Sequence, residues 1–292
     1  MEKQQVRFVM LLLLVAYVVG RILQLFAGRV PSLLIVVLHV IPPALFAAVH
    51  GARIYRWQGS IVFTILCAAV GALFEILSLR TGFPFGHYAF TDLMGPAVFG
   101  LPIMLALAYV GMGYLSWVLG LAILQLHNRQ LSGRNLVVLP VVASFVMTVW
   151  DLSMDPVWAA IDHAWVWRDA GPYYGVPIGN FFGWLLTTYI LYQLFALYLA
   201  NRGVVCSPTN YLLLAIAFYA VSAAGNLLVI APASLGQVFL DASGTRWSVS
   251  TILWASRLIS VFLMLPLSLF AWMRASRKSN PIGQCVANES GS

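Results

Sequence analysis

The residues best suited to chemistry are two aspartates, Asp151 and Asp155, which lie in an apolar stretch. Because they are four residues apart, they share one face of a helix, and Pro156 directly after them predicts that the helix ends there. Two carboxylates that lie close together in a low dielectric cannot both ionise at low cost. One of them is therefore expected to keep its proton and could act as a general acid. The alternative is that the pair binds Arg80 or Arg168 and locks the outer loops.

Glu75 and His87 are a second candidate group, close to each other along the chain. Glu75 lies near the end of an apolar stretch, where a carboxylate needs a partner, a proton or water. The alternative for Glu75 is a salt bridge with Arg80 or Arg257. Histidine is the side chain whose ordinary pKa lies nearest neutral pH, so His87 could relay a proton or orient water, although a turn histidine can equally be a hydrogen-bonding residue. The predicted catalytic group is Asp155, Asp151, Glu75 and His87.

Aromatic side chains are interleaved with these acids in three segments rich in glycine and proline. Many of them are typical of the aromatic belt at a membrane interface. Others could line an apolar pocket, where each ring face stabilises a nearby cation by about 0.5 to 2 kcal/mol. Asn180, one turn inside a helix opened by Pro177, could hold water or a carboxylate. The predicted substrate-binding residues are Phe83, Phe85, Tyr88, Trp150, Trp167, Tyr173, Tyr174, Asn180 and Trp184.

The elements that must position these residues are apolar helices. The chain has 292 residues, of which 61% are hydrophobic and 9% charged, with a mean hydropathy of +0.89. This composition is typical of membrane proteins, and a membrane-spanning helix needs about 20 apolar residues. We predict an all-α, polytopic transmembrane helical bundle of seven to eight spans. It forms a single domain over 1–275, followed by a short disordered, basic and polar tail at 276–292. The predicted spans are 8–27, 33–50, 60–79, 97–126, 136–155, 176–200, 211–230 and 248–273.

Charged residues predict how the bundle is oriented, because cytoplasmic loops retain lysine and arginine. One side carries Lys3, Arg7, Arg53, Arg56, Arg129, Arg134, Arg202, Arg274, Arg277 and Lys278, and the other carries Arg29, Arg80, Arg168 and Arg246. We therefore expect a multi-pass protein of the cytoplasmic (inner) cell membrane with both termini in the cytoplasm. Apart from Glu2 and Glu289 near the termini, all carboxylates fall toward the outer face: Glu75, Asp92, Asp151, Asp155, Asp162, Asp169 and Asp241.

Other classes of site are not indicated. The cysteines Cys67, Cys206 and Cys285 are scattered without metal or disulfide spacing. The basic residues stand singly beside apolar spans, so the net charge of +7 does not indicate nucleic-acid binding. No metal and no cofactor are expected.

Four segments resemble the CruF-type family of membrane carotenoid-biosynthesis proteins. They are Glu75, TGFPFGHY at 81–88, DLSMDP at 151–156 and YYGVPIGNFFGW at 173–184. The resemblance implies a cofactor-independent hydratase, a hydro-lyase that adds water across the terminal C1–C2 double bond of an acyclic (ψ) carotenoid end group. The implied substrate is γ-carotene, lycopene or a C50 relative, met within membrane lipid, and association with other carotenoid-pathway enzymes is also implied.

The chemistry expected of the acids agrees with this resemblance. A protonated carboxylic acid would protonate the terminal alkene, and water delivered by a second group would capture the tertiary cation. We expect Asp155 or Asp151 to donate the proton, and Glu75 or His87 to handle water. Trp150, Tyr88 and Tyr174 would form the wall.

Two alternatives stay open. A membrane prenyltransferase could use the D-x-x-x-D pair to hold magnesium and a diphosphate, but it needs a second acidic cluster. Asp162 and Asp169 are seven residues apart in an irregular loop, and the predicted orientation turns the pair away from the cytoplasm. The other alternative is a non-enzymatic carotenoid-binding or transport protein, for which inverted repeats would be typical.

Overall fold

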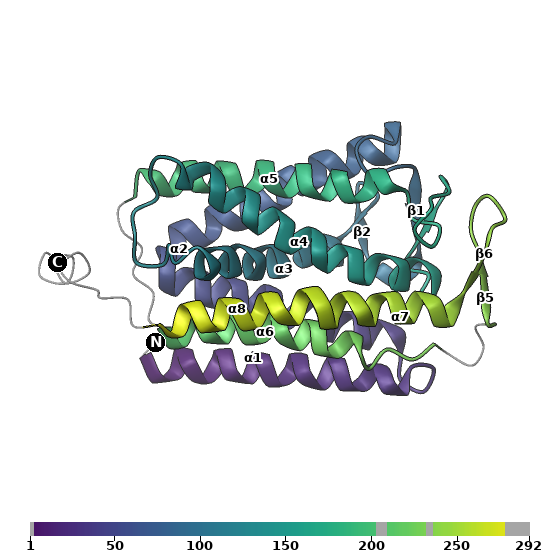
Figure 1. The fold of residues 1–292 in the computed structure, drawn as a ribbon, viewed down its shortest axis with the longest axis horizontal. Coiled ribbons are helices and arrows are strands. Elements are labelled where there is room, and N and C mark those ends of the chain that lie inside the picture. The colour runs from purple at the N-terminus through teal and green to yellow at the C-terminus, as the bar shows by residue number, and fades with distance from the viewer. Residues whose placement is uncertain (1–2, 203–208, 232–235, 278–292) are drawn as a thin grey trace, which may run out of the picture.

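The computed structural model describes residues 3–202, 209–231 and 236–277, which form an elongated bundle of helices (Figure 1). Six helices in these ranges are long and apolar enough to cross a membrane, α7 to α8 counting as one continuous helix. The predicted all-α membrane bundle is confirmed. The helices are α1 (Lys3–Leu23), α2 (Ser32–Thr81), α3 (Ile103–Ile123), α4 (Asn135–Ala160), α5 (Ile178–Ala200), α6 (Thr209–Asn226), α7 (Val249–Ile259) and α8 (Leu265–Ser276), with a π-helical turn, η3 (Ser260–Met264), between the last two.

Helix α2 consists of two antiparallel arms. Arg56 has a non-helical backbone with φ 60° and ψ 168°. The Ser60 hydroxyl donates to the Ala48 carbonyl at 3.1 Å, although a straight helix would separate two such residues by about 18 Å. The chain therefore reverses near Arg56, and the predicted spans 33–50 and 60–79 are separate segments. Counting both arms and including α6, eight helical segments of the described chain lie along the bundle.

Helix α4 continues past Pro156, so the helix end predicted there is wrong. Proline has no N–H to offer the carbonyl four residues earlier, which is that of Leu152. The Tyr173 hydroxyl donates to this carbonyl at 2.9 Å and replaces the missing bond. The other proline of the helix is compensated in the same way, since the Gln193 amide donates to the Leu136 carbonyl at 3.0 Å. Side chains from α5 and from the loop before it thus allow a helix that local rules would end.

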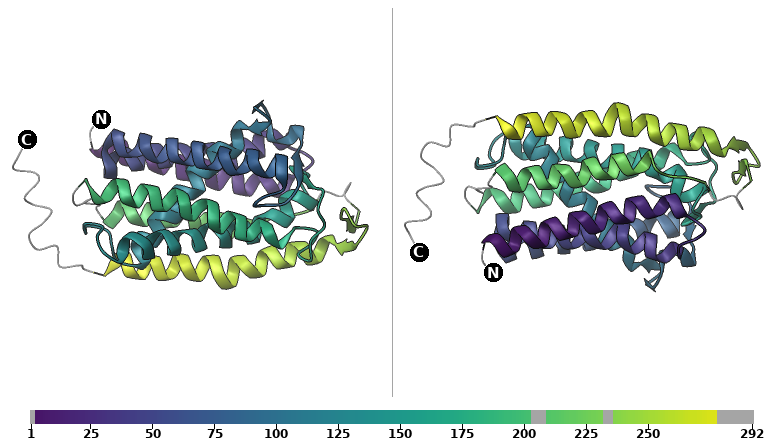
Figure 2. Two further views of the ribbon diagram at one scale, coloured as in Figure 1. Left: turned by 90° about the horizontal axis from the view of Figure 1, so that it is seen from above. Right: turned by 90° about the horizontal axis from the view of Figure 1, so that it is seen from below.

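Short strands cluster at one end of the bundle, opposite the start of α1 and the end of α8 (Figures 1 and 2). The predicted span 97–126 is too long, because its first residues form a hairpin and only α3 is helical. Ser276 ends α8, while 278–292 of the predicted tail, as well as Cys206, lie outside the described residues. The strand pairs, all antiparallel, are β1 (Tyr88–Phe90) with β4 (Trp165–Trp167), β2 (Ala97–Val98) with β3 (Leu101–Pro102), and β5 (Val238–Leu240) with β6 (Arg246–Ser248); the short helices η1 (Gln24–Phe26) and η2 (Asp92–Met94) also occur.

Burial distinguishes the centre of the bundle from its lipid-facing surface. Helix α3 is buried all round over Tyr109–Ala122, as expected of a helix surrounded by others. The outer faces of α1 and of the α7–α8 rod instead expose large apolar side chains, such as Phe8 at 67% and Phe262 at 69%. Such surfaces suit contact with lipid tails and would be unfavourable in water. The short strands lie at one end of the bundle (Figure 1), together with Glu75 near the end of α2 and Asp151 and Asp155 near the end of α4. The candidate site lies at this end.

Candidate active site

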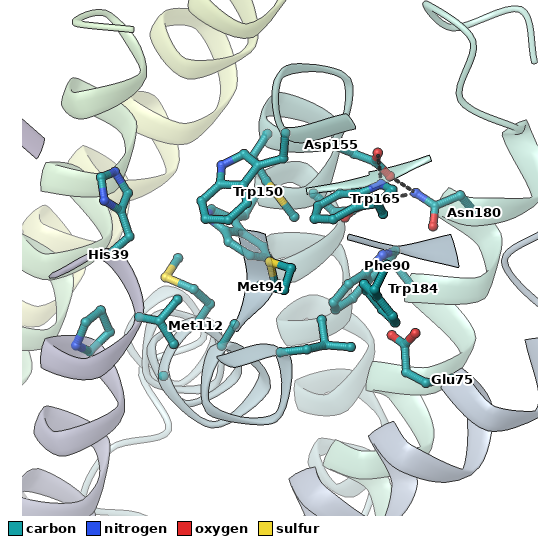
Figure 3. Close-up of a pocket in the computed structure, with 18 of the residues that line it drawn as sticks. His39, Glu75, Phe90, Met94, Met112, Trp150, Asp155, Trp165, Asn180 and Trp184 are labelled. Atoms are coloured by element: carbon teal, nitrogen blue, oxygen red, sulfur yellow. Dashed lines mark hydrogen bonds between the residues drawn. The ribbon is translucent and has the colours of Figure 1, made fainter. Parts of the chain in front are cut away.

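A cavity of about 80 Å³ lies among α1, α2, α3, α4, α5 and the end of α6, beside the β1–β4 strand pair. Half of its lining residues are tryptophan, tyrosine, phenylalanine or methionine, and four polar residues lie at one end, three of which are labelled in Figure 3. At about 10–15 Å³ per water, it has room for roughly five to eight water-sized groups. It can therefore enclose one end of a long molecule rather than its whole length. The four polar residues are Glu75, Asp151, Asp155 and Asn180.

Asn180 joins the two aspartates. Pro177 precedes α5 directly, which places Asn180 in the first turn of that helix, as predicted. Its Nδ2 donates to Asp151 Oδ2 at 3.0 Å and to Asp155 Oδ2 at 2.6 Å. The two aspartates therefore do face the same side of α4, and one amide group fixes both.

Asp155 has further donors, whereas Asp151 has few. The indole N–H groups of Trp165 and Trp167 both donate to Asp155 Oδ1, at 3.1 and 3.2 Å. These tryptophans are two residues apart on β4, so their side chains point to the same face of the strand. Asp151 Oδ1 has no hydrogen-bond partner among the described residues, and the residue is fully buried. The donor pattern suits a charged Asp155 and a protonated Asp151.

Glu75 accepts hydrogen bonds from two phenols. The Tyr109 hydroxyl donates to Oε1 at 2.8 Å, and the Tyr88 hydroxyl donates to Oε2. Burial raises the pKa of Tyr88, and the charge of Glu75 raises it further, so Tyr88 keeps its proton and remains a donor. Sequence reasoning missed Tyr109. The available signal was a tyrosine within an apolar span, where its hydroxyl needs a partner.

The ion pairs considered for the acids are not formed. Among the described residues, His87 with Asp169 is the sole pair within salt-bridge distance, so neither Arg80, Arg168 nor Arg257 neutralises the buried carboxylates. Buried charges without a partner are costly. Three carboxylates beside one small cavity therefore cannot all be ionised at once.

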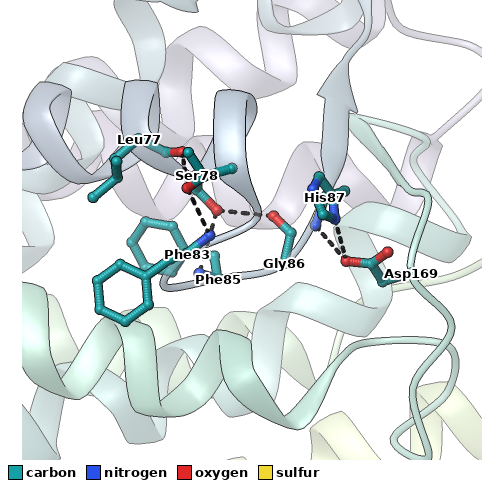
Figure 4. Close-up of polar contacts among 8 residues, drawn as sticks. Leu77, Ser78, Phe83, Phe85, Gly86, His87 and Asp169 are labelled. Atoms are coloured by element: carbon teal, nitrogen blue, oxygen red, sulfur yellow. Dashed lines mark hydrogen bonds and ion pairs between the residues drawn. The ribbon is translucent and has the colours of Figure 1, made fainter.

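His87 lies outside this cavity. Its Nδ1 is 2.9 Å from Asp169 Oδ2, and its backbone N–H donates to the same oxygen at 2.7 Å (Figure 4). These contacts lower the pKa of Asp169, the backbone N–H contributing most. Both side chains are about half exposed, and neither lines the cavity. The pair holds the turn after α2 against the loop that follows β4, and the structure does not bring His87 to the acids.

The predicted substrate-binding residues divide into two sets. Phe83 is 55% exposed and outside the cavity. Tyr173 supports α4, and Tyr174 packs against Trp247 with ring centroids 5.4 Å apart. The residues that do line the cavity are Phe85, Tyr88, Trp150, Trp167, Asn180 and Trp184.

The cavity also has polar residues that sequence reasoning did not place there. Arg21, His39 and Asn226 line its other end. Arg21 lies inside the predicted span 8–27, and His39 lies inside the predicted span 33–50. A basic residue inside a predicted span was the available signal.

The residues present do not form an evident metal centre. No three histidine, cysteine, aspartate or glutamate side chains of the described ranges lie close enough together to share an ion. The N–H groups aimed at Asp155 would also point toward a bound cation, which favours acceptance of hydrogen bonds over metal coordination. This donor set does not fit the magnesium–diphosphate site of the prenyltransferase alternative.

Fold and site together define a polytopic membrane protein with a buried acidic pocket. A model of the family described as carotenoid biosynthesis protein matches residues 32–242, and the chain belongs to this family. Over 126 residues it is 35% identical to bisanhydrobacterioruberin hydratase of Haloarcula japonica, an alignment that covers 41% of this chain and 39% of that protein. The chain thus spans about two fifths of the length of this relative. No solved structure matches the chain. The resemblance to carotenoid-biosynthesis proteins is confirmed, and a carotenoid-modifying role is supported.

Proposed function

We propose that the protein is a carotenoid hydratase, which adds water across the terminal C1–C2 double bond of an acyclic (ψ) end group and yields a tertiary alcohol. The observation that carries the proposal is a group of three buried carboxylates without a cationic partner among the described residues, in a cavity walled by aromatic rings. Alkene hydration needs an acid that stays neutral and a site that tolerates a carbocation. Membership of the family and the similarity to a protein named as a hydratase support the same reaction.

Asp151 is the proposed proton donor. Its Oδ1 has no hydrogen-bond partner among the described residues, so a proton there is free to move to the alkene. The π electrons form the new C–H bond at C2 and leave a tertiary cation at C1. Asp155 stays ionised beside it, because three N–H groups donate to its oxygens. Its negative charge favours the cation electrostatically.

Glu75 and the aromatic wall act on the cation and on water. The rings of Trp184 and Trp167 line the cavity and stabilise positive charge next to them, and Tyr109 stacks on Trp184 with ring centroids 4.7 Å apart. Water attacks C1 and gives its extra proton to Glu75, the remaining carboxylate of the cavity. Transfer of a proton from Glu75 to Asp151 then restores both groups, so alkene and water give the alcohol with no net change in the protein. No cofactor takes part.

Expression in a bacterium that accumulates lycopene or γ-carotene tests this function. The expected result is a pigment that gains one water and carries a tertiary alcohol, with Asp151→Asn as the inactive control. If the protein is present in the membrane and several acyclic carotenoids all stay unchanged, the hydratase is wrong and a non-enzymatic carotenoid-binding or transport protein is favoured. Location in the cytoplasmic membrane, with both termini in the cytoplasm and other pathway enzymes nearby, is part of the same proposal.

A further inference from the structure

The cavity has a second polar end that the proposed hydration does not use. It is formed by Arg21 of α1, His39 of α2 and Asn226 of α6. Figure 3 shows His39 across the cavity from Asp155 and Asn180, with Trp150, Met94 and Met112 drawn between them. The cavity thus places a cation at one end and carboxylates at the other.

Arg21 is a buried cation with donors to spare. Its side chain is 6% exposed, and Nη2 donates to the Ser222 carbonyl at 3.0 Å and to Asn226 Oδ1. Nε has no partner among the described residues, and no carboxylate of those residues lies within ion-pair distance. Asp162, which is exposed, acts on Arg21 only through its longer-range field. An intramembrane arginine in this condition indicates a functional site by default.

The neighbouring residues hold the guanidinium group in place. Gly225 provides the space, because a Cβ there would overlap Arg21 Nε and lie 2.6 Å from Cζ. Asn226 Nδ2 donates to Ser153 Oγ at 2.5 Å and to Ser260 Oγ at 3.0 Å, which leaves its Oδ1 for Arg21. Ser260 begins the π-helical turn η3, an irregularity that is frequent at functional sites. Residues of α6, supported by Ser153 of α4 and Ser260 of η3, therefore hold Arg21 at the cavity wall.

We propose that Arg21 binds a hydroxyl or carbonyl oxygen on the end of the ligand, so that the cavity prefers an oxygen-bearing end group to a pure hydrocarbon. Nε is enclosed against Gly225, whereas Nη1 makes no hydrogen bond among the described residues and is not enclosed in this way. The N–H groups of Nη1 therefore require an oxygen from the ligand, because the surrounding walls are largely apolar. A neutral oxygen fits better than an anion, because three carboxylates share the same cavity. The inference rests on the proposed function only in taking the ligand to be the end of a polyene.

Competition binding tests this preference without turnover. The purified protein in lipid nanodiscs is loaded with lycopene, whose binding is followed by quenching of the cavity tryptophans. The competitors are geraniol and dimethyloctadiene, the hydrocarbon that lacks its hydroxyl group. Because hydrogen bonds to charged groups are strong, we expect geraniol to compete about tenfold better than the hydrocarbon. Arg21→Met should reduce this ratio to nearly one.

Arg257→Met is the matched control. Arg257 also lies in a spanning helix with an unpartnered Nε among the described residues, but it stacks on Trp254 and does not line the cavity. It should keep the wild-type ratio. If Arg21→Met does not accumulate, Arg21→Lys keeps the charge but loses the planar fork, and an intermediate ratio is expected. Equal competition by both compounds in the wild type, or an equal loss for both in the Arg21 variant, would overturn the proposal.

The same preparation separates the two proposals. A preference for geraniol together with no hydration of any carotenoid would support the oxygen site and contradict the hydratase. Hydration without the preference would support the hydratase and contradict the oxygen site.

Discussion

Replacing Asp151 by asparagine separates acid catalysis from structural support. The amide has nearly the same shape as the carboxylic acid but cannot donate a proton to an alkene. Loss of a general acid typically lowers a rate about 100- to 10,000-fold, which corresponds to about 2.7 to 5.4 kcal/mol in the activation barrier. We expect Asp151→Asn to reduce hydration by at least the lower of these factors.

The structure predicts little effect of this change on stability. The amide oxygen of the variant can accept from Asn180 in place of Asp151 Oδ2, which now accepts at 3.0 Å. Its nitrogen then takes the place of Oδ1, which has no partner among the described residues in the wild type either. The protein should therefore insert and unfold like the wild type.

Asp155→Asn should behave differently. Its amide nitrogen must face either the two indole N–H groups at Oδ1 or the Asn180 amide at Oδ2, so donors oppose donors in both orientations. Each buried donor left without an acceptor costs about 1–3 kcal/mol. We expect a clear loss of thermal stability in addition to a loss of activity.

Two measurements decide between these roles: pigment analysis for the hydrated product, and thermal unfolding of the purified variants in detergent. An Asp151→Asn protein that is folded and fully active would refute the assignment of the acid. Equal stability of the two variants would refute the argument from hydrogen-bond donors, whatever their activities.

Three further predictions concern other parts of the molecule. Tyr173→Phe leaves the Leu152 carbonyl without a donor and should destabilise the fold by about 1–3 kcal/mol in thermal or chemical unfolding. The same change should cost less in a Pro156→Ala background, because alanine restores the backbone N–H. Equal costs in both backgrounds would contradict the idea that Tyr173 replaces the hydrogen bond lost at Pro156. His87 holds the pKa of Asp169 below its ordinary 3.8, so their contact stabilises the fold above that pH, and the stabilisation is lost as the pH falls through the lower pKa of the folded state. Asp169→Asn should therefore weaken the decrease of the unfolding temperature at acid pH. An unchanged pH profile of the unfolding temperature would contradict this prediction. Hydration should persist in a metal chelator, and loss of product with EDTA would favour a metal enzyme.

Which features were predictable depends on how local their causes are. Apolar length requires membrane helices, so seven to eight spans could be counted without coordinates. The spacing of Asp151 and Asp155 places them on one helix face, and Pro177 opens the helix that carries Asn180. Each of these follows from neighbouring residues along the chain.

Other features depend on contacts between distant segments. Helix α4 continues past Pro156 because the Tyr173 hydroxyl donates to the Leu152 carbonyl. The helix-breaking tendency of proline does not by itself predict this contact. His87 resembles a catalytic residue by type and spacing, yet Asp169 holds it at the surface. Glu75 binds Tyr109 of another helix rather than an arginine.

The sequence by itself determined a membrane-embedded helical protein with paired acids and a resemblance to carotenoid-biosynthesis proteins. Only the tertiary structure decided which acid receives donors, which aromatic side chains line the cavity, and that Arg21 and Asn226 face its other end. The physical reason is that periodicity and hydropathy act along one helix. Hydrogen-bond partners and cavity walls, in contrast, are set by how separate helices pack.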